Sequence, residues 1–380
     1  MSQHAFDPVA RIAEQLTARI RTEGPLPISV FMLEALFDPV AGFYATRDPI
    51  GAGADFITAP EISQMFGEVL GLWTVQAWRD LGAPAEFHMV ELGPGKGTMM
   101  SDVIRSLGVA PEARHAVRVS LIEASAALKM VQGQTLANSP VPVSWAKSIE
   151  HLPDGPAVLL ANEFLDCLPL RQAVKADGRW RERCVGLDPE DETRFAFVLG
   201  AALAADEALI APELREVPDG SLVELRPGDL QVAESLARRF AAQPGRALFI
   251  DYGPALPDVG DTLQALQAHR KVDPLTAPGT ADLTARVDFA GFARACAERG
   301  LDVHGPAPQG EFLKTLGIEH RAAALMARAG DEPGKARIVR QLHRLTDPGE
   351  MGALFKVMCI SSPDLPPPAG LEPWVDPAVD

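Results

Sequence analysis

The chain has 380 residues, of which 47% are hydrophobic and 23% are charged. This composition is typical of a globular protein and excludes an intrinsically disordered one. Acidic residues outnumber lysines and arginines by 51 to 35, so the formal net charge is −16 at pH 7. A charge of this sign opposes binding to nucleic-acid phosphates and anionic lipids, and it favours basic partners. We therefore expect no nucleic acid among the partners.

The cysteines and the apolar runs exclude two further classes of protein. The four cysteines lie far apart with no C-x-x-C spacing, so neither a metal site nor a disulfide framework is predicted. The longest apolar runs, such as residues 157–161, fall well short of the roughly 20 residues that a membrane-spanning helix needs. The sequence thus predicts a bacterial cytoplasmic protein without membrane insertion.

The N-terminal part is predicted to consist of helices and loops. A first amphipathic helix begins near Asp7 and Pro8, which suit its N-cap and first turn, and its acidic residues are unlike a signal or transit peptide. A second helix follows Thr58-Ala59-Pro60-Glu61, which has the T-x-x-E form of a capping box. Because residues 51–58 are rich in glycine, we expect a long loop between the two helices.

From residue 86 onward, short apolar runs alternate with amphipathic helices. This pattern is typical of a doubly wound parallel sheet with helices on both faces. The runs predicted to be strands are 87–92, 117–123, 141–145, 157–161, 247–252, 301–304 and 355–360. The third run contains a proline, so it is expected at an edge of the sheet. The predicted fold class is therefore α/β, with a doubly wound, Rossmann-like sheet.

The spacing of the strands indicates how the chain is divided. The segment between the fourth and fifth strands is far longer than one crossover helix requires, so we expect an inserted α+β subdomain there. The predicted parts are an N-terminal helical cap (1–85), the first part of the core (86–170), an inserted substrate or lid subdomain (171–245), the second part of the core with a helical elaboration at 304–354 (246–362) and a proline-rich, extended tail (363–380).

The most informative motif is the glycine-rich segment 91–98, with the sequence ELGPGKGT, between a predicted strand and a predicted helix. A phosphate-binding P-loop needs Lys directly before Ser or Thr, but Gly97 separates Lys96 from Thr98. A dinucleotide fingerprint would have its third glycine where Thr98 stands. The remaining pattern is G-x-G-x-G preceded by Glu91, whose carboxylate can pair with a cationic amino-acid group. S-adenosylmethionine (SAM) carries such a group and no phosphate.

A second acid is expected at the end of the second strand, where it would accept hydrogen bonds from the ribose hydroxyls of SAM. Glu123 occupies that position. The alternative is that the glycines form only a tight turn and that Glu123 caps a helix. The predicted cofactor-binding residues are Glu91, Gly93, Gly95, Gly97, Glu123 and Asn162.

Polar residues also follow the fourth strand, in the segment Asn162-Glu163-Phe164-Leu165-Asp166. The carboxyl ends of central strands face the ligand crevice in a doubly wound sheet, so these side chains should project over the bound cofactor. Glu163 and Asp166 could bind one guanidinium group and favour its deprotonation, which makes them the candidate catalytic residues. The alternative is that both acids merely stabilise the N-terminus of a helix.

Other polar residues receive a structural interpretation. Asp251 and Tyr252, at the end of the fifth strand, either line the acceptor site or form a packed wall. Asp282, Thr284 and Asp288 are predicted to be turn and helix-cap residues before the apolar residues that follow.

Taken in order, the motifs resemble those of the MidA-like class I SAM-dependent methyltransferases, a family that includes the protein-arginine methyltransferase required for assembly of mitochondrial complex I. The resemblance covers most of the chain. One departure is Gly53-Ala54-Asp55, where the family has Gly-Asp. The segments that carry the resemblance are 42–44, 55–68, 91–98, 162–169, 251–253, 282–289 and 309–313.

The resemblance implies that the glycine loop binds SAM and that arginine is the methyl acceptor. Our first hypothesis is therefore a SAM-dependent N-methyltransferase that modifies an accessible arginine of a protein, for which the family suggests a respiratory complex I subunit. One alternative is a SAM-binding assembly chaperone without catalysis. Another is methylation of a small molecule or of a nucleic-acid base, and the negative charge counts against the base. The family also has mitochondrial members.

Overall fold

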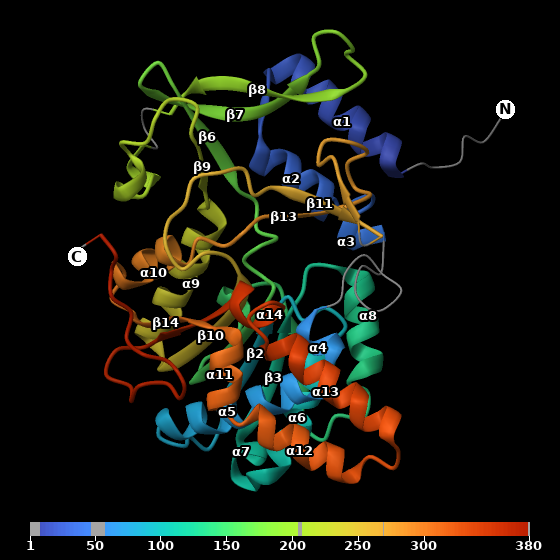
Figure 1. The fold of residues 1–380 in the computed structure, drawn as a ribbon, viewed down its shortest axis with the longest axis vertical. Coiled ribbons are helices and arrows are strands. Elements are labelled where there is room, and N and C mark those ends of the chain that lie inside the picture. The colour runs from blue at the N-terminus through green and yellow to red at the C-terminus, as the bar shows by residue number, and fades with distance from the viewer. Residues whose placement is uncertain (1–7, 47–57, 204–206, 269, 379–380) are drawn as a thin grey trace, which may run out of the picture.

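A seven-stranded sheet forms the centre of the computed structural model, which describes residues 8–46, 58–203, 207–268 and 270–378 (Figure 1). In spatial order its strands are β14 (Asp302–Pro308), β15 (Phe355–Ser361), β10 (Gly245–Tyr252), β5 (Ala157–Asn162), β2 (Phe87–Leu92), β3 (Val117–Ile122) and β4 (Val143–Ala146). These are the seven predicted strands, and β4 lies at an edge as expected. The α/β fold class is thereby confirmed.

The direction of one strand differs from the prediction. The strands from β10 to β4 are parallel, but β15 runs antiparallel to both β10 and β14. The run Phe355–Ser361 is almost wholly buried, and such a run looks the same in either direction. The expectation of an entirely parallel sheet was therefore wrong at this strand.

Helices cover both faces of the sheet because its strands are apolar on both sides. Along β10, Leu248 packs into one apolar layer and Phe249 into the other, as the two-residue period of a strand requires. The helices on the Leu248 face are α5 (Gln64–Asp80), α6 (Thr98–Ser106), α7 (Pro111–Ala116), α11 (Gln309–Thr315) and α12 (Ile318–Arg328). Those on the Phe249 face are α9 (Pro227–Ala242) and α10 (Phe289–Ala297), while α8 (Ala126–Thr135) packs beside α6.

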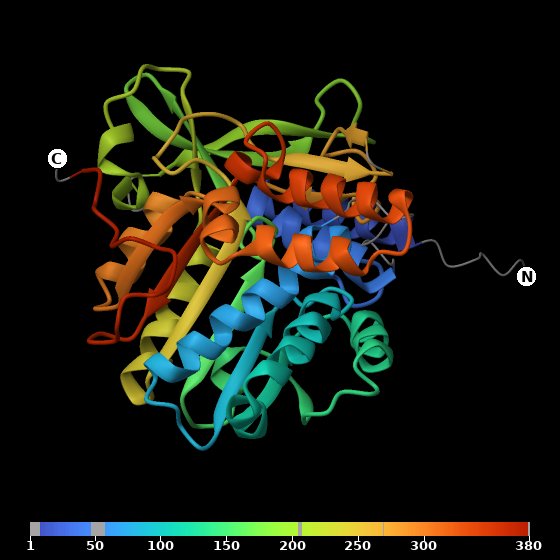
Figure 2. The same ribbon diagram turned by 60° about the horizontal axis from the view of Figure 1, so that its bottom comes forward.

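A second, five-stranded antiparallel sheet lies at one end of the molecule (Figures 1 and 2). It comprises β1 (Leu26–Pro27), β7 (Arg179–Leu187), β6 (Arg171–Ala176), β9 (Leu222–Leu225) and β8 (Phe195–Ala202). The predicted antiparallel insertion is thus present, and the N-terminal segment adds β1 to it. The helices α1 (Pro8–Glu23) and α2 (Ile28–Phe37) pack in the same apolar cluster as Val185 of β7.

A third sheet was not predicted. It comprises β12 (Arg270–Val272), β11 (Gln264–Gln267) and β13 (Asp282–Thr284), whose three or four residues each are too few to show a periodic pattern. Leu283 of β13 packs in the cluster that contains α1 and α2. This small sheet therefore packs against the N-terminal helices, and it lies with them over the carboxyl ends of the core strands.

The N-terminal half differs from the prediction in its helix boundaries. Thr58 occupies the N-cap position of α4 (Ala59–Ile62), but its side chain makes no capping hydrogen bond, and α4 ends after one turn at Ser63. Ser63 has an extended backbone, and its hydroxyl accepts a hydrogen bond from the Met65 N–H at the start of α5. The predicted capping box is therefore wrong. The helices α2 and α3 (Phe43–Thr46) were not predicted, and Asp7 and residues 51–57 lie outside the described residues.

The C-terminal region follows the predicted outline. The helical elaboration comprises α11, α12, α13 (Glu332–Thr346) and α14 (Met351–Leu354), and it starts after β14. The tail is extended, as expected, but it is attached to the sheet: His304 forms a β-bridge with Pro373, and the Trp374 N–H donates to the Val303 carbonyl at 2.9 Å. Short 3₁₀ helices occur at Leu107–Val109, Ile149–His151, Glu207–Leu209 and Pro212–Leu214. Within the described ranges, every helix is too short or too polar to span a bilayer.

Candidate active site

A cavity of about 1090 Å³ lies at the carboxyl ends of the central strands. This is where ligands bind in open α/β sheets. Of the eight predicted site residues, seven line this cavity: Glu91, Gly93, Gly95, Glu123, Asn162, Glu163 and Asp166. Gly97 does not line it and instead forms the N-cap of α6. The structure therefore brings the predicted residues together around one space.

The walls of the cavity come only partly from the segments that were expected to cover it. The N-terminal residues Phe37, Tyr44 and Pro60 line it, as do Gly228 and Leu230 at the start of α9. In contrast, the described residues of β6, β7, β8 and β9 contribute nothing to its lining, whereas β11 and β13 do. Within the predicted lid segment 171–245, the start of α9 therefore lines the cavity and the described strands do not.

The loop after β2 requires its glycines. Gly93, Gly95 and Gly97 have φ angles of 62°, 52° and 79°, in the left-handed region that side chains other than glycine rarely adopt. At Gly93 a Cβ atom would also lie 3.2 Å from the ring of Phe164. The backbone can therefore pass close to a ligand at this loop, as the sequence predicted.

Glu91 is a buried carboxylate with one unused oxygen. Its side chain accepts a hydrogen bond from the backbone N–H of Met100, but Oε2 has no partner among the described residues. Burial, with a smaller effect of Glu123, raises the pKa of Glu91 well above its usual value. A buried acid in this state gains most from a cationic partner, so Glu91 fits the ammonium group of SAM.

Glu123 is held in place at the end of β3. Its Oε1 accepts a hydrogen bond from the Ser125 N–H at 2.7 Å, and its Oε2 accepts one from Gln132 Nε2 at 3.0 Å. Burial raises the pKa of Glu123. The alternative that Glu123 caps a helix is wrong, because the Ser125 hydroxyl caps α8 by accepting the Leu128 N–H.

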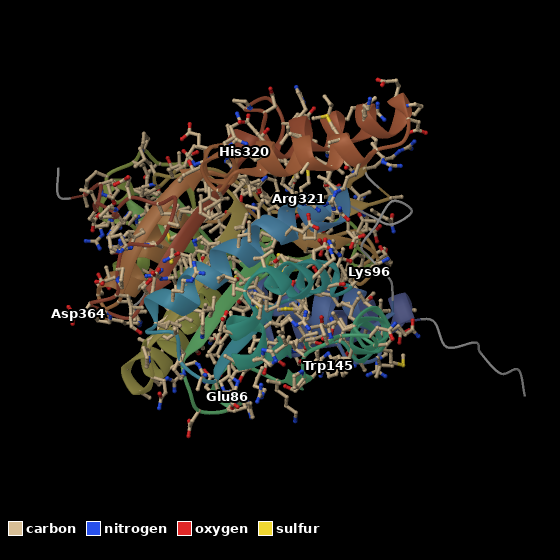
Figure 3. The ribbon with its side chains drawn as sticks, turned by 90° about the horizontal axis from the view of Figure 1, so that it is seen from below. Glu86, Lys96, Trp145, His320, Arg321 and Asp364 are labelled. Atoms are coloured by element: carbon tan, nitrogen blue, oxygen red, sulfur yellow. The ribbon has the colours of Figure 1, made fainter. Side chains whose placement is uncertain are left out.

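Sequence reasoning missed Gln132, which is fully buried on α8. Its Nε2 also lies 2.8 Å from the Gly95 carbonyl oxygen, and its Oε1 accepts a hydrogen bond from the Trp145 indole at 2.8 Å. Trp145 is seen beside α8 in Figure 3. A signal was available, because Gln132 lies four residues after Leu128 and four before Leu136, on the apolar face of the helix.

The turn after β5 is strained at Glu163. This residue has a φ angle of 53°, which is costly for a side chain other than glycine and is concentrated at functional sites. Its carboxylate accepts hydrogen bonds from Asn162 Nδ2 at 2.9 Å and from the Ala59 N–H. Burial and the neighbouring Asp251 raise the pKa of Glu163 to about 8. Residues 163–170 form turns and no helix, so the helix-terminus interpretation of these acids is wrong.

Asp251 lies beneath this turn and fixes its shape. One carboxylate oxygen accepts the N–H groups of Phe164, Leu165 and Asp166 at 3.1, 2.9 and 3.2 Å. Burial raises the pKa of Asp251 to about 7. Asp251 does not line the cavity, whereas Tyr252 does. Asp251 is therefore a support for the turn, and Tyr252 is a wall residue.

Asp166 completes the group of acids. Its side chain is 5% exposed, and within the described part of the chain its Oδ1 has no hydrogen-bond partner. Burial, followed by the charges of Asp251 and Glu163, raises the pKa of Asp166 well above its usual value, although Arg226 partly opposes this shift. Carboxylates that crowd together in this way favour a bound cation.

The fold and the cavity together are those of the class I methyltransferases that the sequence resembles. A family model described as "Putative S-adenosyl-L-methionine-dependent methyltransferase" matches residues 69–307. The chain belongs to this family, and its cofactor is SAM. The glycine loop and the unpartnered Glu91 oxygen are consistent with that cofactor.

Named relatives are similar over nearly the whole chain. "Protein arginine methyltransferase NDUFAF7, mitochondrial" of Mus musculus is 35% identical over 370 residues, which are 91% of this chain and 83% of that protein. The homologue of that protein in Drosophila melanogaster is 38% identical over 377 residues, covering 92% and 84% of the two chains. The family resemblance is thereby confirmed.

Solved structures agree with this assignment. A crystal structure from Burkholderia thailandensis bound to S-adenosyl-homocysteine is 26% identical, has a TM-score of 0.78 and covers 93% of this chain and 92% of that one. A second crystal structure from the same organism is 27% identical, with a TM-score of 0.79. The protein is therefore a methyltransferase with a fold shared by a chain that binds the demethylated form of SAM.

Proposed function

We propose that this enzyme transfers the methyl group of SAM to a guanidinium nitrogen of an arginine in a protein substrate. The observation that carries the proposal is the pair of acids Glu163 and Asp166 beside the cofactor-binding half of the cavity, with Asp166 Oδ1 buried and unpartnered among the described residues. A guanidinium offers five N–H donors and a permanent positive charge, which suit two carboxylates. The names of the relatives as protein arginine methyltransferases support the same acceptor.

We assign the cofactor to Glu91, Gly93, Gly95, Glu123 and Asn162, which line the cavity, and to the glycine loop as shaped by Gly97 at the N-cap of α6. Glu91 would pair with the ammonium group, and Glu123 would accept the ribose hydroxyls while Gln132 holds it. Asn162 Oδ1 is buried without a partner among the described residues, so it is available to a donor on the ligand. When bound, SAM supplies an electrophilic methyl group on a sulfonium.

Glu163 and Asp166 would bind and orient the guanidinium for in-line attack on that methyl group. The attacking nitrogen forms a bond to carbon, the carbon–sulfur bond breaks, and the nitrogen loses one proton. Glu163 is the candidate acceptor of this proton: burial raises its pKa to about 8 without ligands, and the positive charges of the guanidinium and the sulfonium would lower this pKa, so that the carboxylate is ionised when both are bound. Most of the acceleration would come from positioning the two reactants.

The substrate protein and the location in the cell belong to the proposal. The acidic chain favours a basic partner, and the family resemblance suggests a respiratory complex I subunit. The named relatives are mitochondrial proteins, and we propose a cytoplasmic location for this bacterial-type chain. We also keep the five-part division of the chain, with α5 at the end of the N-terminal cap, as an interpretation.

Two variants test the assignment. Gly95→Val should abolish SAM binding in calorimetry, because its side chain would force a left-handed backbone to change. Glu163→Gln should bind SAM as tightly as the wild type and lose methyl transfer to arginine peptides. Unchanged SAM binding by Gly95→Val would overturn the cofactor assignment, and full transfer by Glu163→Gln would remove Glu163 from the mechanism.

A further inference from the structure

The acceptor half of the cavity has a further wall, made by β13. Asp282 and Thr284 are 2% and 4% exposed, and both line the cavity. They are two residues apart on the strand, so their side chains lie on the same face. The Ala285 N–H donates to the Asp166 carbonyl at 3.0 Å, which fixes β13 against the turn that carries Glu163 and Asp166. Asp282 and Thr284 were predicted to be turn and cap residues, and only Asp288 has that role, as the N-cap of α10.

Tyr44 of α3 holds Asp282 in place. Its hydroxyl donates a hydrogen bond to Asp282 Oδ1 at 2.8 Å. The ring is fixed by Phe37 and Phe43, whose centroids lie 5.5 and 5.3 Å away. Burial, with smaller contributions from Asp282 and other neighbours, raises the pKa of Tyr44 well above its usual value. Tyr44 therefore remains a neutral hydrogen-bond donor, and Asp282 is oriented before any ligand arrives.

The backbone of Tyr44 also reaches the cofactor half of the cavity. Its carbonyl oxygen accepts a hydrogen bond from the Ser125 hydroxyl at 2.6 Å. The N–H of the same serine donates to Glu123 at 2.7 Å. One residue of α3 is thus connected on one side to the proposed ribose site and on the other to Asp282.

One buried polar atom beside this wall lacks a partner. Across the described ranges, nothing donates to Asp166 Oδ1, whereas the Thr284 hydroxyl is hydrogen-bonded to Tyr252, another residue of the cavity wall. Asp166 and Thr284 are both more than nine-tenths buried and line the cavity. Buried polar groups in folded proteins are nearly always hydrogen-bonded, so the unpartnered oxygen of Asp166 indicates a ligand with a donor between β13 and the turn after β5.

We propose that Asp282, oriented by Tyr44 and flanked by Thr284, is a third acidic contact of the acceptor and makes the site selective for a guanidinium over a primary ammonium. The inference rests on the proposed function. Glu163 and Asp166 approach the acceptor from the turn after β5, and Asp282 approaches from β13. A guanidinium spreads five N–H donors around a plane, so it can donate to the acids of the turn and to Asp282 of β13 at once. A lysine ammonium has three donors on a single nitrogen.

Steady-state kinetics with matched arginine and lysine peptides test this inference. Asp282→Asn should raise KM for the arginine peptide at least tenfold and lower the arginine-over-lysine ratio of kcat/KM by a similar factor. Its SAM affinity should stay within twofold of the wild type. Tyr44→Phe, which removes the hydroxyl and keeps the ring, should raise the same KM severalfold. The matched control is Asp258→Asn, an exposed acid outside the cavity, which should change neither value.

A folded Asp282→Asn variant with wild-type KM and selectivity would overturn the inference while leaving the proposed function intact. If Asp282→Asn does not fold, an unchanged KM for the arginine peptide in Tyr44→Phe would overturn the inference instead. If the wild type methylates no arginine, the proposed function fails, and binding then decides the inference separately. Calorimetry of the protein loaded with S-adenosyl-homocysteine should show arginine-peptide binding that Asp282→Asn weakens tenfold; equal binding, or none to the wild type, would refute it.

Discussion

Gln132 donates a hydrogen bond to the Glu123 carboxylate at 3.0 Å, and the same nitrogen contacts the Gly95 carbonyl at 2.8 Å. One buried amide thus joins the glycine loop after β2 to the acid at the end of β3. The Trp145 indole fixes the orientation of that amide by donating to its oxygen. The two segments proposed to hold different parts of SAM are therefore positioned by a residue that need not touch the cofactor itself.

Gln132→Ala should weaken SAM binding roughly tenfold, because Glu123 and the Gly95 carbonyl lose a shared hydrogen bond worth about 1.5 kcal/mol. Calorimetric titration with SAM measures this effect. Gln134→Ala is the control, since that residue is exposed on the same helix. Equal SAM affinity in the two variants would show that Gln132 does not position the site.

Glu91→Gln should lose SAM affinity by tenfold or more while the ligand-free protein becomes no less stable. The reason is that the buried carboxylate costs free energy until a cation pairs with it. Thermal unfolding with and without SAM measures both effects. Glu86→Gln, at the exposed opposite end of β2 (Figure 3), should respond to SAM as the wild type does. A Glu91→Gln protein stabilised normally by SAM would contradict the proposed ammonium contact.

The pH dependence of stability should change in Glu163→Gln. The folded protein retains a proton on Glu163 up to about pH 8, whereas the unfolded chain releases it near pH 4.3. Since the folded state binds more protons between these values, Glu163 makes the free energy of unfolding fall as pH rises. Denaturant unfolding at pH 5.5 and 8.5 should show a steeper fall in the wild type than in the variant, by roughly 1–3 kcal/mol because solvent screens the partly exposed side chain. Parallel pH profiles would refute the raised pKa.

Asp80→Ala should destabilise the fold by about 3–5 kcal/mol, because it leaves the buried Arg246 guanidinium without its charge partner. The two side chains are 2.5 Å apart and almost inaccessible, and Arg246 also binds the Ser361 hydroxyl and the Pro366 carbonyl of the tail. Denaturant unfolding measures the loss. Arg79→Ala, on the exposed side of α5, should cost under about 1 kcal/mol. Similar losses in both variants would contradict this role.

A second ion cluster stabilises the contact between α5 and α12. Arg321, which is labelled in Figure 3, donates to Glu68 at 2.6 and 3.0 Å, and Arg105 of α6 donates to the same carboxylate at 3.1 Å. The two guanidinium groups lower the pKa of Glu68 despite its burial. The helical elaboration is thereby fixed on the helices of the core.

The features that could be predicted from the sequence are those set by residues that are close together in the chain. Left-handed φ angles demand glycine at positions 93, 95 and 97, and an acid in the last positions of an apolar strand, or directly after it, lies at the carboxyl end of that strand. Glu91, Glu123 and Glu163 could therefore be placed without the structure. The seven strands were recognisable for the same reason, since each is a short apolar run.

The features that were missed depend on contacts between distant segments. Tyr44 and Asp282 are 238 residues apart in the chain, and neither lies in a segment with a periodic pattern. The direction of β15 follows from its pairing with β10 and β14, which its own residues do not encode. Thr58 satisfied the capping-box pattern, yet Ser63 five residues later became the cap of the long helix.

The most direct test of the account is the fate of a labelled methyl group. The purified enzyme is incubated with methyl-labelled SAM and an extract from cells that lack it, and the labelled proteins are hydrolysed to amino acids. Label is expected in methylarginine, and none is expected when Glu163→Gln replaces the wild type. Label in another amino acid or in a small molecule, or equal labelling by the variant, would contradict this expectation.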